Sequence, residues 1–215
     1  MDHAWLIEER EYARQEARRG RRHAFENIDP TRTALVVVDL VPFFFTENDY
    51  VRATVPRVNS LAAALRAAGG TVAWVAPAPT PPSPAYDEFL GPDAAEVFRG
   101  AGGEGPVRDR LWPELEAADG DVYAEKSTPS AFFPGRSDLP QQLTRIDTLL
   151  VTGTVTNVCV EGTVRDASAL GYRIVVVADA CAARRDQDHN ATLHTVYRIF
   201  GDVRPTAEVL ELIAG

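Results

Sequence analysis

Cysteine is scarce in this sequence, with only Cys159 and Cys181 among 215 residues. Two cysteines are too few for a disulfide framework, and no Cys/His cluster has the spacing of zinc ligands. Long apolar runs are missing as well, so we expect no membrane-spanning helix, and the charged first residues do not form a signal peptide. Together these absences predict a cytoplasmic protein whose thiols stay reduced.

Two nucleotide-binding motifs are also missing. Neither G-x-G-x-x-G nor G-x-x-x-x-G-K-[ST] follows an expected strand, so a dinucleotide or P-loop site has no support. The formal net charge of -9 disfavours nucleic-acid binding, which depends on neutralising phosphates with lysine and arginine. We therefore expect neither a nucleic acid nor a membrane as a partner. The acidic balance fits simple solubility and is compatible with a cationic substrate.

What the sequence does contain is a repeated alternation of strand and helix. Helical segments such as 55–70 and 157–171 each end at glycine, a residue typical of helix C-termini. The alternation predicts an α/β fold built on a doubly wound parallel sheet. Short apolar runs predict its strands at 34–40, 71–77, 121–126, 148–153, 173–179 and 201–205.

The chain divides into an arm and one domain. Residues 1–29 are charged, and we expect an N-terminal helical arm that packs on the body or on a second subunit. Residues 30–215 are enough for a single domain with a substantial core. Within that domain, 77–110 is rich in proline and glycine and too long for a plain connector. We expect an irregular excursion there, either a lid over the carboxyl edge of the sheet or a surface insertion.

Candidate reactive residues follow the predicted strands, and ligands of open α/β sheets bind beyond the carboxyl ends of strands. Asp39 follows the first strand, Lys126 the third, and the turn before Cys159 the fourth, while Asp179 ends a further strand. A carboxylate beside a thiol can take its proton, and a lysine can stabilise the ionised sulfur. A helix N-terminus at the cysteine would favour the thiolate and offer N–H groups to an oxyanion. Each residue taken alone also fits packing, capping or a solvated surface.

Longer motifs place these residues in a known context. TALVVVDL around Asp39, SAFF shortly after Lys126, LLVTGTVTNVCVEGTVRDASALGYRIVVVADA and DHNATL resemble the isochorismatase-like cysteine hydrolase superfamily. The resemblance runs from about residue 31 to 212 and leaves out the excursion. It implies a three-layer α/β/α fold, Rossmann-like, with a doubly wound six-stranded parallel sheet. It also implies a catalytic triad of Asp39, Lys126 and Cys159.

The same resemblance implies how the turn before the cysteine is used. A cis peptide bond is expected between Thr154 and Val155. Its implied use is to aim the N–H of Val155, together with that of Cys159, into an oxyanion hole.

The resemblance also implies a reaction class. Most members hydrolyse C–N bonds of amides or ureido groups and, in one group, a streptothricin lactam. Because this chain has a cysteine at the nucleophile position, the resemblance implies a cofactor-independent amidohydrolase that works through a thioester acyl-enzyme. Two alternatives stay open. One is vinyl-ether hydrolysis of isochorismate with Asp39 as the acid, and the other is a non-catalytic module that binds a small molecule or a partner.

Two departures from the family pattern bear on the substrate. Many members carry D-x-Q-x-x-F after the first strand, but this chain has DLVPFF, with Val41 at the glutamine position. Valine cannot make that hydrogen bond, so we expect a different choice of substrate. Nicotinamidases hold a metal with Asp and His residues just after this strand, and this chain has no histidine between His23 and His189. We therefore expect no metal and disfavour nicotinamide.

Aromatic residues are the candidates for a wall of the substrate pocket, although each of them also fits an ordinary core. Phe44 and Phe132 are favoured because they flank Asp39 and Lys126. The candidates are Phe43, Phe44, Trp112, Phe132 and Phe133.

The remaining candidates are assigned to structure rather than chemistry. Cys181 is interpreted as a packing residue. His189 and His194 lie five apart on one predicted helix, which is poor geometry for a shared ligand, and both are interpreted as structural. The expected partners are a small-molecule substrate and further copies of the chain, in a dimer or larger homo-oligomer.

Overall fold

The computed structural model describes residues 1–46 and 48–215. Within these residues six strands form one sheet in the order β3-β2-β1-β4-β5-β6, and every pairing is parallel. All of the predicted strands are confirmed, and the fifth extends three residues beyond its predicted end. The strands are β1 (Thr33–Val38), β2 (Thr71–Pro77), β3 (Val122–Lys126), β4 (Thr148–Thr154), β5 (Arg173–Ala182) and β6 (Asp202–Arg204).

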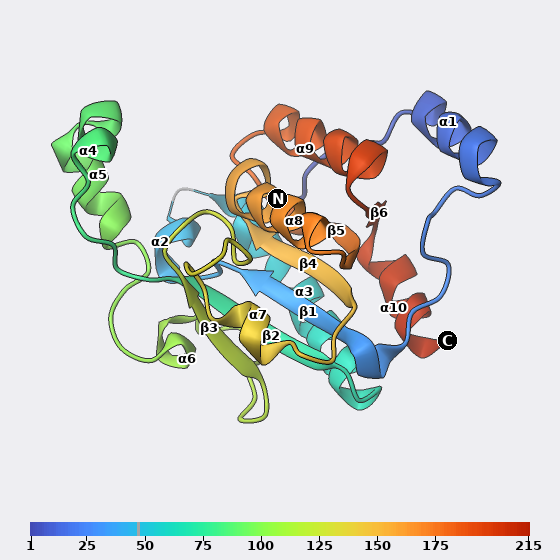
Figure 1. Ribbon diagram of the computed structural model, residues 1–215, viewed down its shortest axis with the longest axis horizontal. Helices are drawn as coiled ribbons and strands as arrows, with labels where there is room; N and C mark the ends of the chain where they lie inside the picture. The colour runs from blue at the N-terminus through green and yellow to red at the C-terminus, as the bar shows by residue number, and fades with distance from the viewer. Residues whose placement is uncertain (47) are drawn as a thin grey trace.

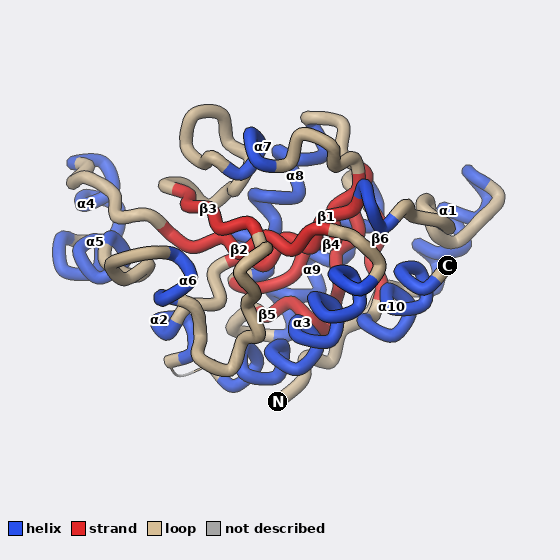
Figure 2. The backbone as a smooth tube through the Cα atoms, turned by 90° about the horizontal axis from the view of Figure 1, so that it is seen from below, coloured by secondary structure: helices blue, strands red, loops and turns tan. Residues whose placement is uncertain are grey.

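Helices cover both faces of this sheet (Figure 1). The principal covering helices are α3 (Asp49–Ala67), α8 (Glu161–Ala169), α9 (Asp186–Ile199) and α10 (Thr206–Ala214). Figure 2 shows α8 on one side of the sheet and α3 and α10 on the other. Short helical segments occur at η1 (Pro30–Arg32), α2 (Pro42–Phe45), α7 (Leu139–Gln142) and the π-helical turn η2 (Thr156–Val160).

Burial on both faces explains why the sequence of the central strand β1 is apolar throughout. Every residue of β1 is buried. Val36 and Val38 pack in the core under α8 and α9, whereas Leu35 and Val37 pack in the core under α3 and α10. Successive side chains of a strand point to opposite faces, so a strand covered on both sides needs apolar residues at every position. The chain winds outward from β1 to β3 and then returns to β4, so β1 and β4 meet at the topological switch point.

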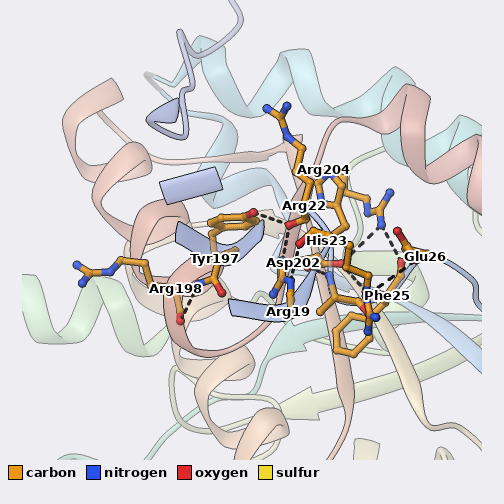
Figure 3. Close-up of polar contacts among 12 residues, drawn as sticks. Arg19, Arg22, His23, Phe25, Glu26, Tyr197, Arg198, Asp202 and Arg204 are labelled. Carbon is orange, nitrogen blue, oxygen red and sulfur yellow. Dashed lines mark hydrogen bonds and ion pairs between the residues drawn. The ribbon is translucent and has the colours of Figure 1, made fainter. Parts of the chain in front are cut away.

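The N-terminal arm packs on the body of its own chain. Its helix α1 (Glu9–Arg19) lies near α9, and the turn after it is held by a buried carboxylate (Figure 3). Asp202 accepts hydrogen bonds from the N–H groups of Ala24 at 2.7 Å and Phe25 at 2.9 Å. Arg204 donates to the Phe25 carbonyl at 2.7 Å. The contact with a second subunit stays a prediction.

The excursion at 77–110 is more regular than its composition predicts. It contains α4 (Pro84–Leu90), α5 (Pro92–Arg99) and α6 (Val107–Arg110), so the expectation of irregular structure is wrong. Pro84 and Pro92 stand at the first positions of their helices, where a missing N–H leaves no bond unmade. The pair α4–α5 stands off the body beyond the carboxyl ends of the strands (Figure 1).

One helix start differs from the prediction. The helix predicted from residue 55 begins at Asp49, because the side chain of Asn48 caps it by accepting a hydrogen bond from the Tyr50 N–H at 3.2 Å. Across the part of the chain that the structure describes, every helix is too short or too polar to span a bilayer.

Candidate active site

Asp39 follows β1 at the carboxyl edge of the sheet. Its φ of 57° lies in the left-handed region, where a residue other than glycine is strained. The Asp39 N–H donates to the Val75 carbonyl at 2.9 Å, and its own carbonyl accepts from the Val41 N–H at 2.9 Å, which holds this conformation. The side chain of Asp39 is completely buried. A strained residue with a buried carboxylate is typical of a functional site.

Lys126 is the last residue of β3 and connects the other two candidates. Its Nζ lies 2.8 Å from Oδ2 of Asp39 and 3.5 Å from Sγ of Cys159. A third contact, 3.3 Å to the Thr128 carbonyl, completes the hydrogen bonds of the ammonium group. The side chain is almost fully buried. The structure thus brings together the three residues that the sequence singled out.

Cys159 lies in the π-helical turn between β4 and α8. The turn begins at Thr156, so the cysteine is its fourth residue, and the helix predicted to begin near Cys159 starts slightly earlier. The Val155 carbonyl accepts from the N–H groups of Val158 at 3.0 Å and Val160 at 3.3 Å. The peptide bond between Thr154 and Val155 is cis, which confirms that prediction.

A glycine at the end of β4 allows this turn to sit against β1. Gly153 pairs with Val38 and has a φ of 112°. A Cβ atom at this position would lie only 2.1 Å from the Val38 carbonyl oxygen. No other residue type fits without moving the two central strands apart. Gly153 therefore sets the distance between β1 and β4, the strands that Asp39 and Cys159 follow.

The electrostatics of the three groups define their resting state. Burial raises the pKa of the Asp39 carboxyl, an effect that the Lys126 ammonium opposes. Burial also disfavours the charge of Lys126, but the neighbouring Asp39 and Cys159 outweigh this and raise the lysine pKa. Burial and the negative charge of Asp39 raise the pKa of the Cys159 thiol to about 12. At neutral pH the sulfur is therefore a thiol, and it must lose its proton during any reaction.

The five aromatic candidates fall into two groups. Phe43 and Phe44 lie on α2 with their rings edge to face, and Phe98 of α5 contacts Phe43 with ring centroids 5.8 Å apart. Phe133 is about half exposed, at 49%.

The other two candidates pack inward. Phe132 is buried against Tyr172 in the core. Trp112 stacks on Phe45 with ring centroids 4.1 Å apart. As residues that line a substrate pocket, all five stay predictions.

Asp179, the remaining candidate at a strand end, has another place in the fold. Asp179 lies inside β5 and accepts from the N–H and hydroxyl of Thr206, so it caps α10 instead of joining the cluster. Val41, at the position of the family glutamine, is buried. Within residues 1–46 and 48–215, no group of three or more His, Cys, Asp or Glu side chains is placed to hold a metal ion.

One contact near the cysteine has no signal in the local sequence pattern. The Nδ1 atom of His189, on α9, lies 2.9 Å from the hydroxyl of Thr156 at the start of the π-helical turn. The two residues are 33 positions apart, so local periodicity carries no signal for their contact. The DHNATL motif contains this histidine and was the only available indication.

Comparison with known proteins decides the family. A model of the isochorismatase domain matches residues 33–208. The chain belongs to the isochorismatase family. It is therefore a member of a hydrolase family.

Relatives of this isochorismatase-family chain include proteins with and without a described activity. It is 34% identical over 194 residues to the uncharacterized isochorismatase family protein YwoC of Bacillus subtilis, covering 87% of this chain and 97% of that protein. It is 32% identical over 203 residues to the ureidoacrylate amidohydrolase RutB of Pseudomonas savastanoi, covering 80% of each. The crystal structure of a cysteine hydrolase from Pseudomonas syringae superposes with a TM-score of 0.75 at 27% identity, covering 89% of this chain and 97% of that one.

Proposed function

We propose that this isochorismatase-family hydrolase is a cofactor-independent cysteine amidohydrolase that cleaves a C–N bond in an amide, ureido compound or lactam. One observation carries the proposal: the Lys126 ammonium lies between the Asp39 carboxylate, at 2.8 Å, and the Cys159 sulfur, at 3.5 Å. A base, a cation and a thiol in contact are the groups that nucleophilic catalysis by cysteine needs. The similarity to an amidohydrolase supports the reaction class.

The acylation step uses Asp39 first as a base and then as an acid. As the Cys159 sulfur attacks the substrate carbonyl carbon, the S–H proton passes to the Asp39 carboxylate and a C–S bond forms. The carbonyl oxygen becomes an oxyanion, and the backbone N–H groups of Val155 and Cys159 are the proposed donors to it. Asp39 then gives the proton to the leaving nitrogen, the C–N bond breaks, and an amine or ammonia departs from a thioester.

The deacylation step returns the enzyme to its starting state. A water molecule attacks the thioester carbonyl while Asp39 takes one of its protons. The C–S bond breaks, the acid product leaves, and Asp39 returns the proton to the sulfur. No proton or electron is gained or lost by the enzyme over one turnover.

Lys126 has a supporting role in this cycle. Burial alone would favour the neutral form of Asp39, and a neutral carboxyl cannot accept the thiol proton. The ion pair with Lys126 keeps the carboxylate charged, and the burial that raises its pKa makes it a stronger base. The same ammonium lies beside the sulfur and stabilises the negative charge that develops on the sulfur during the reaction.

A substrate screen tests the proposal. Purified protein is incubated with amides, N-carbamoyl amino acids, ureido acids and lactams, and release of ammonia or of new amine and carboxylate is measured. We expect turnover of at least one class by the wild-type protein and none by Cys159→Ala. Cys181→Ala is the matched control and should retain the activity. Equal turnover by the wild-type protein and Cys159→Ala would contradict the proposal.

A further inference from the structure

The side chain of His189 contacts the turn that carries the proposed oxyanion donors. Its Nδ1 is 2.9 Å from the Thr156 hydroxyl, and both side chains are completely inaccessible to solvent. Thr156 follows Val155 in the chain and begins the π-helical turn that ends one residue after Cys159. The contact therefore joins α9 to the short segment on which both proposed N–H donors lie.

The charge state of His189 does not change near neutral pH. Burial, together with any positive charge on the neighbouring His3, lowers the pKa of His189 to about 3. The ring is neutral at neutral pH, and a neutral imidazole has one nitrogen that donates and one that accepts. A ring that does not titrate near neutral pH is suited to holding a neighbour in place, and unsuited to proton transfer.

The first residues of the chain pack against the ring of His189. We call Met1–Ile7 the N-terminal strap. His3 of the strap stacks on His189 with centroids 4.2 Å apart, and its other face stacks on Tyr50 at 3.8 Å. The Nδ1 of His3 lies 2.7 Å from Asp186, and its Nε2 accepts from the Ala183 N–H at 3.0 Å.

A second side chain of α9 holds the strap in register. The amide oxygen of Asn190 accepts from the Leu6 N–H at 2.7 Å, and its amide nitrogen donates to the Ala4 carbonyl at 3.0 Å. Asn190 also follows His189 directly in the sequence. The strap, the ring and the turn thus form one connected set of contacts on the carboxyl side of the sheet.

We propose that His189 is a positioning residue for the oxyanion donors, which it holds through Thr156, and that the N-terminal strap fixes its ring. This inference rests on the proposed function. Oxyanion donors act only within a narrow range of distance and direction, and a displacement of about 1 Å can lower a rate by about 10²-fold. A hydrogen bond to the residue beside Val155 restrains that displacement. His189 touches no reacting atom in this account.

Two reactions of the same sulfur separate positioning from a general structural role. Acylation of Cys159 by p-nitrophenyl acetate passes through a tetrahedral oxyanion, because the sulfur adds to the carbonyl before p-nitrophenolate leaves. Alkylation by iodoacetamide displaces iodide directly and forms no oxyanion. Both need the same sulfur and the same base. Loss of the oxyanion donors therefore slows acylation selectively.

The test measures both rate constants under single-turnover conditions. In His189→Leu we expect acylation to fall by about 10-fold to 10²-fold, with alkylation unchanged to within about 2-fold. Thr156→Val removes the hydroxyl and keeps the ring stack, and it should show the same selective loss. His189→Asn places an amide near the position of Nδ1 and should recover part of the acylation rate. His3→Ala should produce a smaller loss of the same kind.

Matched variants and an additivity test complete the experiment. His194→Leu alters the other histidine of α9, which faces Glu11 of the arm at 3.7 Å, and both rates should stay at the wild-type value. The double variant His189→Leu/Thr156→Val should be no slower in acylation than the slower single variant, because both changes remove one bond. Thermal unfolding of each variant establishes that it is folded, and Thr156→Val carries the test if His189→Leu does not fold.

The outcomes distinguish the inference from the function on which it rests. Equal losses in acylation and alkylation, or no loss in either, would overturn the positioning role while leaving the proposed function intact. Independent, additive losses in the double variant would also overturn it. A wild-type protein in which neither reagent modifies Cys159 would instead contradict the proposed function.

Discussion

The two cysteines of this chain occupy contrasting regions. Cys159 lies in the turn after β4, where its sulfur is 3.5 Å from the Lys126 ammonium and close to Asp39. Cys181 lies inside β5, where its sulfur faces the Val151 carbonyl at 3.6 Å. Both are buried, and burial raises the pKa of both thiols. The resting pKa of the thiol therefore does not distinguish Cys159, the proposed nucleophile. What differs is direct contact: the Cys159 sulfur lies beside the Lys126 ammonium, whereas the Cys181 sulfur lies against a backbone carbonyl.

The positions of the two residues explain this difference. Cys181 pairs with Gly153 near the carboxyl ends of β5 and β4, but it still lies within the strand, with its sulfur against the Val151 carbonyl. Cys159 comes after the strand has ended, at the edge where side chains from β1 and β3 converge. In a parallel sheet only that edge gathers side chains from separate strands around one point.

The largest expected effect comes from removing one sulfur or the other. Cys159→Ala should lower kcat/KM by about 10³-fold or more, because the proposed mechanism forms the acyl-enzyme on this sulfur. Cys181→Ala should retain turnover within about 2-fold. Steady-state kinetics on the best substrate of the screen provides the measurement. Comparable losses in both variants would erase the contrast between the two regions.

Removing the Lys126 ammonium should make the surroundings of Cys159 resemble those of Cys181. Lys126→Met keeps the side-chain length and should lower kcat/KM by about 10²-fold. Without the ammonium, the buried Asp39 loses the charge that opposes its upward pKa shift, so its pKa should rise further. The acid limb of the pH–rate profile should then move to higher pH in the residual activity. An unchanged limb would mean that Lys126 does not control the ionisation of Asp39.

The pH dependence of alkylation sharpens the comparison further. In the proposed mechanism the charged Asp39 takes the thiol proton, so the rate at Cys159 should fall as the pH drops through the carboxyl pKa, which burial raises above its usual value. In Asp39→Asn this limb should disappear. The reaction should then speed up only at alkaline pH, because burial still raises the thiol pKa. Peptide mass spectrometry after iodoacetamide treatment locates the modified residue, and a limb that persists in Asp39→Asn would assign the base elsewhere.

The smallest effect concerns the structural cysteine. Cys181→Ala removes a buried sulfur from the carboxyl end of β5 and should lower the free energy of unfolding by about 1 kcal/mol. Urea denaturation measures the change. In the folded protein Cys181 should resist alkylation over a time that modifies Cys159 completely. Rapid labelling of Cys181 in the native state would show that burial does not protect it.

Much of the fold was predictable because its signals are local. The buried strands are short apolar runs, and their ends place Asp39, Lys126 and the cysteine turn at one edge. The family resemblance of the motif around Cys159 also implied the cis peptide bond that the structure contains. A glycine in that motif was interpretable only with the structure, because the close approach of Gly153 to β1 depends on the pairing of two strands.

Other features were beyond reach of the sequence for physical reasons. Proline is typical both of irregular segments and of the first position of a helix, so the composition of 77–110 did not show that Pro84 and Pro92 begin helices. Phe132 and Phe133 are adjacent and chemically identical, yet one is buried in the core and the other is about half exposed. The bond between Thr156 and His189 joins elements that meet only after the sheet has formed.

The most direct test of the central claim is to capture the acyl-enzyme. The protein is mixed with p-nitrophenyl acetate, quenched in acid within the burst phase, digested and examined by peptide mass spectrometry. The account predicts an acetyl thioester on Cys159, no such adduct on Cys181, and loss of the burst in Cys159→Ala. A burst that persists in Cys159→Ala, or an acyl group found on another residue, would contradict it.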